Sequence, residues 1–320
     1  MSKKGFPTAR LFILALITVV SVAAQSAPMH PLVIYGDDNR LEVYEEPDLD
    51  RRELADSVAV LLSATSLEAD LGIPGLNNIL GKSYGVENRL CSTERFFEQS
   101  APGYCSGFLV AENIVATAGH CVTNPDFCED VRFAFGFMLT SEQDNPRAIP
   151  DENIYGCKRV LYDEMTSLGS DFALIELDRP VLNRKPLPIA KSVPLVGEEV
   201  FVIGHPVGLP TKISAGASVR RNTTEFFVAN LDTFGGNSGS AVFNEQNEVA
   251  GILVRGENDF VRRGNCAISY RCPNDLCRGE DVSNADLVAK KLDEILNPAP
   301  AQNSEPQVPE LRPVPEEWLN

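Results

Sequence analysis

Hydrophobic and polar residues alternate over many short stretches between residues 91 and 284, a pattern typical of antiparallel β-sheets. The clearest stretch is 131–137, where four large apolar side chains fall on one face of an extended chain. Further strands are expected at 106–110, 114–118, 171–177, 200–204, 224–231, 240–243 and 249–254. The pattern therefore predicts an all-β domain built from many short strands.

Two segments have the spacing of a helix instead. Residues 285–296 follow Asn284, a good N-cap, and place one apolar face toward the domain through Leu287, Val288, Leu292 and Ile295. Residues 57–71 are also expected to form a helix, with Val58, Leu61, Leu62 and Leu67 on one face. Beyond them, residues 298–320 contain six prolines and predict an extended, disordered tail.

The first 27 residues have the pattern of a signal peptide. Basic residues come first, the apolar run 11–24 follows, and small residues lead to Ala27. This run is shorter than the roughly 20 residues that a membrane-spanning helix needs. We therefore expect cleavage after Ala24 or Ala27, a secreted or periplasmic protein, and no membrane attachment afterwards. Residues 28–85 would then form a propeptide or an N-terminal arm.

Charge and cysteine content agree with export. The formal net charge is -17, which disfavours nucleic acid as a partner and favours a soluble monomer. All eight cysteines follow the apolar run, and an even number in an exported protein predicts disulfides. Cys128 and Cys157 bracket an expected hairpin and form a natural pair, whereas Cys91, Cys266, Cys272 and Cys277 allow three pairings. Their spacing lacks a zinc-binding pattern, so we expect no metal and no cofactor.

Three short segments bring a histidine, an aspartate and a serine in that order. They are 118–121 around His120, 170–174 around Asp171 and 235–240 around Ser238. A serine hydroxyl becomes a strong nucleophile when a neutral imidazole takes its proton. A carboxylate holds that imidazole in the required tautomer, and glycines beside the serine let backbone N–H groups point at an oxyanion. The set therefore predicts nucleophilic hydrolysis.

The order of these residues narrows the fold. An α/β-hydrolase needs a histidine after its serine, and no histidine follows Ser238. The subtilisin order needs an aspartate before the histidine within alternating strands and helices, and the segment before His120 has no such alternation. The His-Asp-Ser order of the chymotrypsin class remains. His205 lies at an expected strand end and is interpreted as structural.

Residues 86–291 resemble bacterial members of the trypsin/chymotrypsin superfamily, and are similar to the V8-like, glutamyl-endopeptidase branch, whose nucleophile segment also reads Gly-Asn-Ser-Gly-Ser. The resemblance implies a domain at 86–297 with two six-stranded antiparallel Greek-key barrels, at about 86–182 and 186–284, and a C-terminal helix. It makes His120 the general base, Asp171 its orienter and Ser238 the nucleophile. It also implies an oxyanion hole from the N–H groups of Gly236 and Ser238, and a Cys105–Cys121 disulfide.

The resemblance implies a serine endopeptidase that acts on proteins or peptides through an acyl-enzyme. The sequence departs from the family pattern at two positions, one linked to zymogen activation and one to the support of the catalytic aspartate. Asn237 replaces an aspartate that pairs with a new amino terminus in trypsin-like zymogens, so we expect the pocket to form without that ion pair. Val254 replaces a serine that supports the buried aspartate, so Asp171 needs another partner.

Substrate preference depends on three positions of the expected pocket. Asp232 lies six residues before Ser238, where trypsin-like relatives select Lys or Arg. Thr233 matches a V8-like pocket residue, but Leu253 stands where glutamate-specific relatives carry a histidine. We therefore expect a preference for Lys or Arg at P1, with cleavage after Glu or small residues as the alternative. A catalytically silent, protease-like binding protein is the competing class, and the intact triad favours the enzyme.

Overall fold

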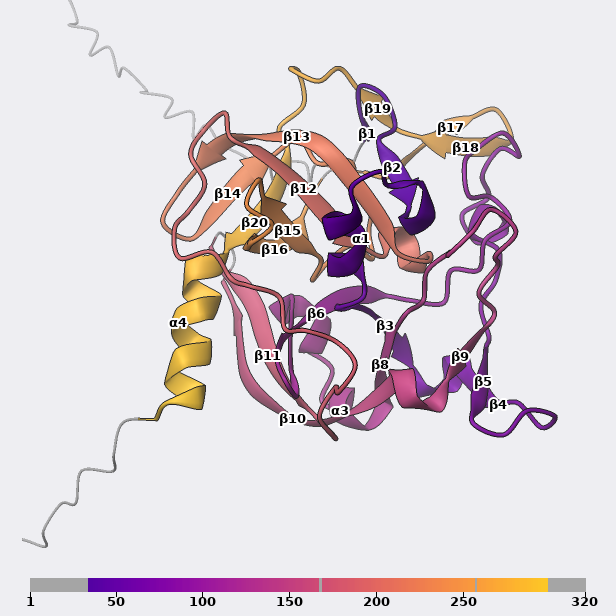
Figure 1. The fold of residues 1–320 in the computed structure, drawn as a ribbon. Helices are drawn as coiled ribbons and strands as arrows, with labels where there is room; N and C mark the ends of the chain where they lie inside the picture. The colour runs from indigo at the N-terminus through magenta and orange to yellow at the C-terminus, as the bar shows by residue number, and fades with distance from the viewer. Residues whose placement is uncertain (1–33, 167–168, 257, 299–320) are drawn as a thin grey trace, which may run out of the picture.

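The computed structural model describes residues 34–166, 169–256 and 258–298, which form two β-barrels followed by a helix (Figure 1). The first barrel is closed, antiparallel and six-stranded. Its strands, in hydrogen-bonded order, are β10 (Ile154–Met165), β11 (Asp171–Leu177), β7 (Ile114–Thr117), β6 (Cys105–Ala111), β3 (Val58–Ser63) and β8 (Val131–Phe135).

The second barrel also closes with six antiparallel strands, because β12 pairs with both β15 and β13. A seventh strand, β2 (Arg40–Glu42), extends the sheet beside β13. The other strands, in order, are β12 (Glu199–Gly204), β15 (Ala241–Asn244), β16 (Val249–Arg255), β20 (Glu280–Asn284), β14 (Phe226–Ala229) and β13 (Lys212–Asn222). The all-β, two-barrel prediction is confirmed.

In the described ranges, three short sheets and several short helices lie outside the two barrels. Two short sheets pair β1 (Ile34–Tyr35) with β19 (Arg271–Cys272) and β17 (Phe260–Arg263) with β18 (Cys266–Ser269). A third joins β4 (Leu67–Ala69), β5 (Leu76–Ile79) and β9 (Ala148–Pro150). The short helices are α1 (Leu49–Ala55), α2 (Tyr84–Glu87), α3 (Phe127–Asp130) and the 3-10 turns η1 (Val43–Glu45), η2 (Ala64–Ser66), η3 (Gly119–Val122), η4 (Asp151–Asn153) and η5 (Pro206–Gly208).

The helix expected at 57–71 is wrong. Residues 58–63 form β3, which pairs with β6 on one side and β8 on the other. Val58 to Leu62 are all fully buried, because both faces of a barrel strand are covered. An unbroken apolar run of this kind fits a doubly buried strand better than a helix with one apolar face. The first barrel consequently begins well before the boundary expected near residue 86.

The helix α4 (Ala285–Leu296) matches its prediction and packs against β16 and β20 (Figure 1). Val288 and Leu292 are buried, and Leu287 and Ile295 pack against the same core. Asn284 occupies the N-cap position, but its amide donates to the carbonyl oxygen of Thr223 rather than capping the helix. The barrel therefore fixes the start of this helix.

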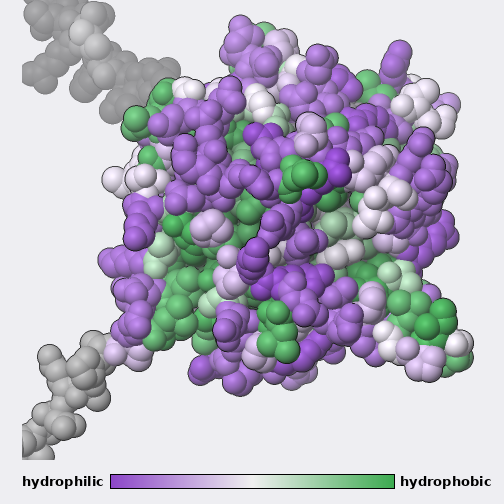
Figure 2. All heavy atoms as spheres, in the orientation of Figure 1, coloured by the Kyte–Doolittle hydropathy of each residue, from purple (hydrophilic) through white to green (hydrophobic). Residues whose placement is uncertain are grey.

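The signal peptide expected at 1–27, and all of the tail expected at 298–320 except Pro298, lie outside the described residues. In the part of the chain that is described, no helix is both long and apolar enough to cross a bilayer. The face in Figure 2 is mostly polar, with an apolar cluster over the β4–β5 end of the molecule, where Leu71 and Ile73 are exposed. Exposed apolar side chains are common on the surfaces of folded proteins.

Candidate active site

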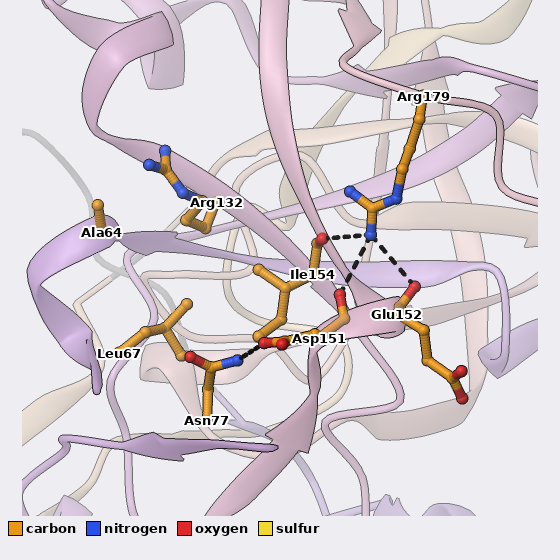
Figure 3. A pocket seen from close by; sticks show the side chains of 8 residues that line it. All are labelled: Ala64, Leu67, Asn77, Arg132, Asp151, Glu152, Ile154 and Arg179. Carbon is orange, nitrogen blue, oxygen red and sulfur yellow. Dashed lines mark hydrogen bonds between the residues drawn. The ribbon is translucent and has the colours of Figure 1, made fainter. Parts of the chain in front are cut away.

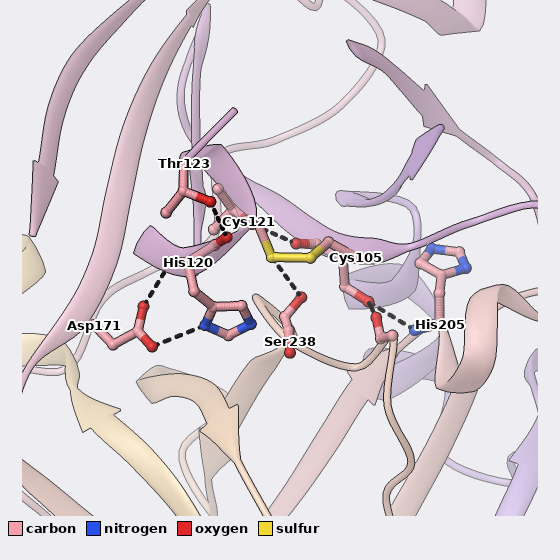
Figure 4. The surroundings of a disulfide bond; sticks show 10 residues. Cys105, His120, Cys121, Thr123, Asp171, His205 and Ser238 are labelled. Atoms are coloured by element: carbon pink, nitrogen blue, oxygen red, sulfur yellow. Dashed lines mark hydrogen bonds and ion pairs between the residues drawn. A yellow bond between two sulfur atoms is a disulfide. The ribbon is translucent and has the colours of Figure 1, made fainter. Parts of the chain in front are cut away.

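The three residues singled out by the motifs come from three separate segments of the chain and lie near one another (Figure 4). His120 lies in η3 directly after β7, and Asp171 is the first residue of β11, so both belong to the first barrel. Ser238 lies in the loop between β14 and β15 of the second barrel. The fold thus brings together side chains that are far apart in the sequence.

His120 and Asp171 are joined by two hydrogen bonds. The imidazole Nδ1 lies 2.8 Å from Oδ2 of Asp171, and the backbone N–H of His120 donates to Oδ1 at 2.9 Å. Gly119 makes this approach possible, since a Cβ there would lie 2.2 Å from the carbonyl oxygen of Glu164. The aspartate consequently fixes both the backbone and the ring of the histidine, leaving Nε2 as the proton acceptor.

Arg255, the last residue of β16, supplies a positive charge beside this carboxylate. Its Nη1 lies 3.7 Å from Oδ2 of Asp171, while its Nε bonds to Asp281. Burial alone would raise the pKa of Asp171, but the bonds from His120 and the charge of Arg255 hold that pKa below its ordinary value. Asp171 is therefore ionised at neutral pH, as an orienting carboxylate must be.

Ser283 of β20 holds the backbone of Asp171. Its hydroxyl accepts from the N–H of Asp171 at 3.0 Å and donates to the carbonyl oxygen of the same residue at 3.2 Å. Sequence reasoning found neither Arg255 nor Ser283. Arg255 directly follows Val254, where a supporting group was sought, and this adjacency is the signal that could have found it.

Ser238 is tied to the first barrel through its backbone. Its carbonyl oxygen accepts from the N–H of Ser106 at 2.8 Å and lies 3.8 Å from the sulfur of Cys121, in the Cys105–Cys121 disulfide. In Figure 4 the imidazole of His120 is seen between Asp171 and Ser238. Among the described residues, Nε2 of His120 and Oγ of Ser238 are not hydrogen bonded, which is common in peptidases without substrate.

Among the described residues, two backbone N–H groups of the segment 235–240 have no acceptor, those of Gly236 and of Ser238. Gly235, Asn237, Gly239 and Ser240 all donate to carbonyl or carboxylate oxygens. The N–H groups of Gly236 and Ser238 donate to no group in the described part of the chain. These are the two groups that the resemblance assigns to an oxyanion hole, and their free hydrogens suit that task.

The direction of both N–H groups is fixed by hydrogen bonds to the carbonyl group of the same peptide unit. In a trans peptide the carbonyl and the following N–H point in opposite directions. The carbonyl of Gly235 accepts from Val207, which turns the N–H of Gly236 the other way. The carbonyl of Asn237 accepts from the N–H of Ser240 at 2.8 Å, which in the same way turns the N–H of Ser238 in the opposite direction. The directions of these two N–H groups are thus fixed by contacts within the protein, and donors that are oriented in advance in this way are the effective ones.

Ser106 and His205 support this loop. The hydroxyl of Ser106 donates to the carbonyl oxygen of Gly236 at 2.9 Å and accepts from the N–H of His205 at 3.0 Å. Burial lowers the pKa of His205 to about 3, so its ring stays neutral, with Nδ1 bonded to the carbonyl oxygen of Leu209. The structural interpretation of His205 agrees with these contacts.

The residues predicted to line the specificity pocket are all buried. Both oxygens of Asp232 accept backbone N–H groups from the N-terminal segment, from Tyr35 at 2.6 Å and from Asn39 at 2.9 Å. The hydroxyl of Thr233 donates to buried Glu280 at 3.3 Å, and Leu253 lies in the core of the second barrel. Burial raises the pKa of Asp232 to about 7, although the two N–H groups oppose the shift.

All eight cysteines are paired. The expected Cys105–Cys121 and Cys128–Cys157 bonds are present, and the four cysteines left open form Cys91–Cys266 and Cys272–Cys277. Cys91 and Cys266 are 175 residues apart, so only the tertiary structure could pair them. This bond ties the segment between β3 and β6 to β18.

A pocket of about 580 Å³ lies elsewhere on the first barrel (Figure 3). Arg179 crosses it and donates to the carbonyl oxygens of Asp151, Glu152 and Ile154. None of its eight lining residues belongs to the candidate triad. This pocket is therefore separate from the candidate triad.

A family model matches the part of the chain that carries the three candidate catalytic residues. Residues 105–252, which include His120, Asp171 and Ser238, match the family model of the trypsin-like peptidase domain. The chain therefore contains a trypsin-like peptidase domain, and it is a serine-type endopeptidase.

Two solved structures are similar at low sequence identity. One is a Glu endopeptidase in complex with MPD, with 19% identity, a TM-score of 0.49, and coverage of 82% of this chain and 99% of that one. The other is the Vibrio cholerae VesB protease, with 13% identity, a TM-score of 0.49, and coverage of 83% of this chain and 68% of that one.

Proposed function

We propose that this protein is an exported endopeptidase that hydrolyses peptide bonds through an acyl-enzyme, with His120, Asp171 and Ser238 as its triad. The observation that supports this best is the buried Asp171 carboxylate bonded to both the ring and the backbone of His120. A carboxylate in this position orients the imidazole and stabilises the imidazolium that forms during catalysis. Protein or peptide substrates follow from the domain family.

The reaction has two halves, the acylation of Ser238 and the hydrolysis of the acyl-enzyme. Oγ of Ser238 attacks the scissile carbonyl carbon while its proton passes to Nε2 of His120, and the N–H groups of Gly236 and Ser238 bind the oxyanion. The C–N bond then breaks, and the imidazolium gives its proton to the leaving amine. Water next attacks the ester, transfers a proton to His120, and releases the acid, so that Ser238 regains its hydrogen.

A fluorophosphonate probe tests the proposal. The parent protein should be labelled covalently, and Ser238→Ala should not, because the probe reacts only with an activated serine. His120→Ala should also abolish labelling at neutral pH. An unlabelled but folded parent protein would contradict the proposal and favour the protease-like binding protein.

The preference for Lys or Arg at P1 stays a prediction that rests on Asp232. The contacts of Asp232 argue against it, since both oxygens are already bound by backbone N–H groups and its raised pKa reduces its charge near neutral pH. A peptide-library profile of the parent and of Asp232→Asn decides the point. A preference for Arg that disappears in the variant would support a role of Asp232 in P1 selection. Identical cleavage profiles of the two proteins would show that Asp232 has no such role.

Export is proposed on the pattern of residues 1–27 and on the four disulfides. Disulfides persist in oxidising compartments and are rare in the cytosol. Amino-terminal sequencing of the protein recovered from the culture medium or the periplasm would locate the cleavage site. Recovery of the reduced protein in the cytosolic fraction, with Met1 retained, would contradict export.

A further inference from the structure

Residues 34–48, the first described part of the segment 28–85 and called the arm below, are built into the second barrel. Strand β2 of the arm pairs with β13, and its strand β1 pairs with β19, next to the Cys272–Cys277 disulfide. The largest of its buried side chains is Arg40, which is only 1% exposed. A charged side chain is rarely buried to this degree unless specific partners hold it.

Arg40 has one acidic partner, Asp38, and two aromatic partners, Phe234 and the more distant Phe96, whose ring centre lies 5.4 Å from the guanidinium carbon. Its Nε and Nη2 each lie 2.8 Å from the carboxylate of Asp38, in a bidentate ion pair. Its guanidinium carbon lies 4.1 Å from the centre of the Phe234 ring, a cation–π distance. Arg95 completes the cluster by contacting Asp38 at 3.3 Å and donating to the carbonyl oxygen of Arg40. The cation is therefore fixed over Phe234.

Phe234 belongs to the segment that carries the candidate oxyanion hole. It is fully buried, and its carbonyl oxygen accepts from the N–H of Asn237 at 3.0 Å. Two residues earlier, Asp232 accepts the arm N–H groups described above. The arm thus contacts this segment at two points, six and four residues before Ser238, and Gly236 lies between these points and the nucleophile.

Asn237 cannot order the segment by an ion pair, because its amide carries no charge. Its Oδ1 instead accepts from the hydroxyl of Ser240 at 3.2 Å. Arg40 nevertheless places a positive charge against residues 232–238, through its contact with Phe234. This charge belongs to a side chain within the chain and not to an amino terminus. The contacts of Arg40 need no cleavage to form.

We propose that Arg40 is a positioning residue that orders residues 232–238, so that the N–H groups of Gly236 and Ser238 are correctly placed without a newly formed amino terminus. The inference rests on the proposed function, since it assigns a support to the same oxyanion hole. It also makes the arm a permanent part of the peptidase and not a removable propeptide.

Arg40→Met tests this, because methionine fills much of the space but carries no charge. The matched control is Arg51→Met, since Arg51 also belongs to the N-terminal region and stacks on an aromatic ring, that of Phe201 at 4.5 Å, but does not contact residues 232–238. We expect Arg40→Met to slow fluorophosphonate labelling and to lower kcat about 100-fold, with a much smaller change in KM. Arg51→Met should stay within about twofold of the parent in both.

The midpoint temperature of unfolding separates positioning from general stability. If Arg40→Met unfolds at a lower temperature but is labelled at the parent rate while folded, Arg40 is only structural and the proposal is overturned. If Arg40→Met does not fold, Arg40→Gln, which also removes the charge, replaces it, and a labelling rate equal to that of the parent again overturns the proposal. A parent protein that is not labelled at all would instead contradict the proposed function.

Discussion

Replacing Asp171 with asparagine tests how the geometry around His120 produces an active base. The backbone N–H of His120 donates to Oδ1, so an asparagine at 171 must turn its own oxygen toward that N–H. Its amide nitrogen then faces Nδ1 of His120 and donates to it. The imidazole proton is forced onto Nε2, which can no longer accept the proton of Ser238.

In this variant the two hydrogen bonds to His120 lose their charged partner. A hydrogen bond to a charged group contributes about 1.5–3 kcal/mol and a neutral one about 0.5–1.5 kcal/mol, so the two together lose roughly 2–3 kcal/mol. At 1.36 kcal/mol per tenfold change in rate, this loss corresponds to roughly 30- to 150-fold in kcat. Because the wrong tautomer is imposed as well, we expect a larger total loss, about 10⁴-fold.

The assay is steady-state cleavage of a peptide identified from the library profile, with kcat and KM determined separately. Glu176→Gln is the matched control, since Glu176 is another carboxylate of β11 whose partners are Lys158 and Arg159. It makes the same change of charge and should remain within about twofold of the parent enzyme. An Asp171→Asn variant that is folded and retains more than about a tenth of the parent kcat near pH 7 would refute the reasoning.

Three further predictions concern the groups around the site. Arg255→Gln should lower kcat about fivefold, and less at high salt, because a partly exposed charge 3.7 Å from Asp171 is screened. Ser106→Ala should lower kcat about tenfold with little change in KM, since it frees the carbonyl of Gly236. Burial raises the pKa of Asp259 to about 7, so in the folded protein this group keeps its proton over a pH range in which it ionises in the unfolded chain. Its contribution to stability therefore falls as the pH rises from about 4 to about 7, and thermal melts should show that Asp259→Asn stabilises the protein at about pH 8 but not at about pH 4.

The fold class and the α4 helix could be predicted because each depends on local signals. Alternating side chains define individual strands, and the order of three short motifs selects one topology among those that carry such residues. The apolar face of α4 repeats at the helical period, so its burial follows from spacing alone. The strand β3 was missed for the complementary reason, because a strand buried on both faces has no alternation to distinguish it from a helix.

The sequence by itself determined which residues can perform the chemistry, since a nucleophile, a base and a carboxylate are recognised by type and order. Only the tertiary structure decided what surrounds them. Asp232 bonds to Tyr35 across 197 positions of the chain, and Arg255 reaches Asp171 from the other barrel. Such contacts depend on how the barrels close and leave no local pattern, because burial and charge pairing act between neighbours in space, whatever their separation along the chain.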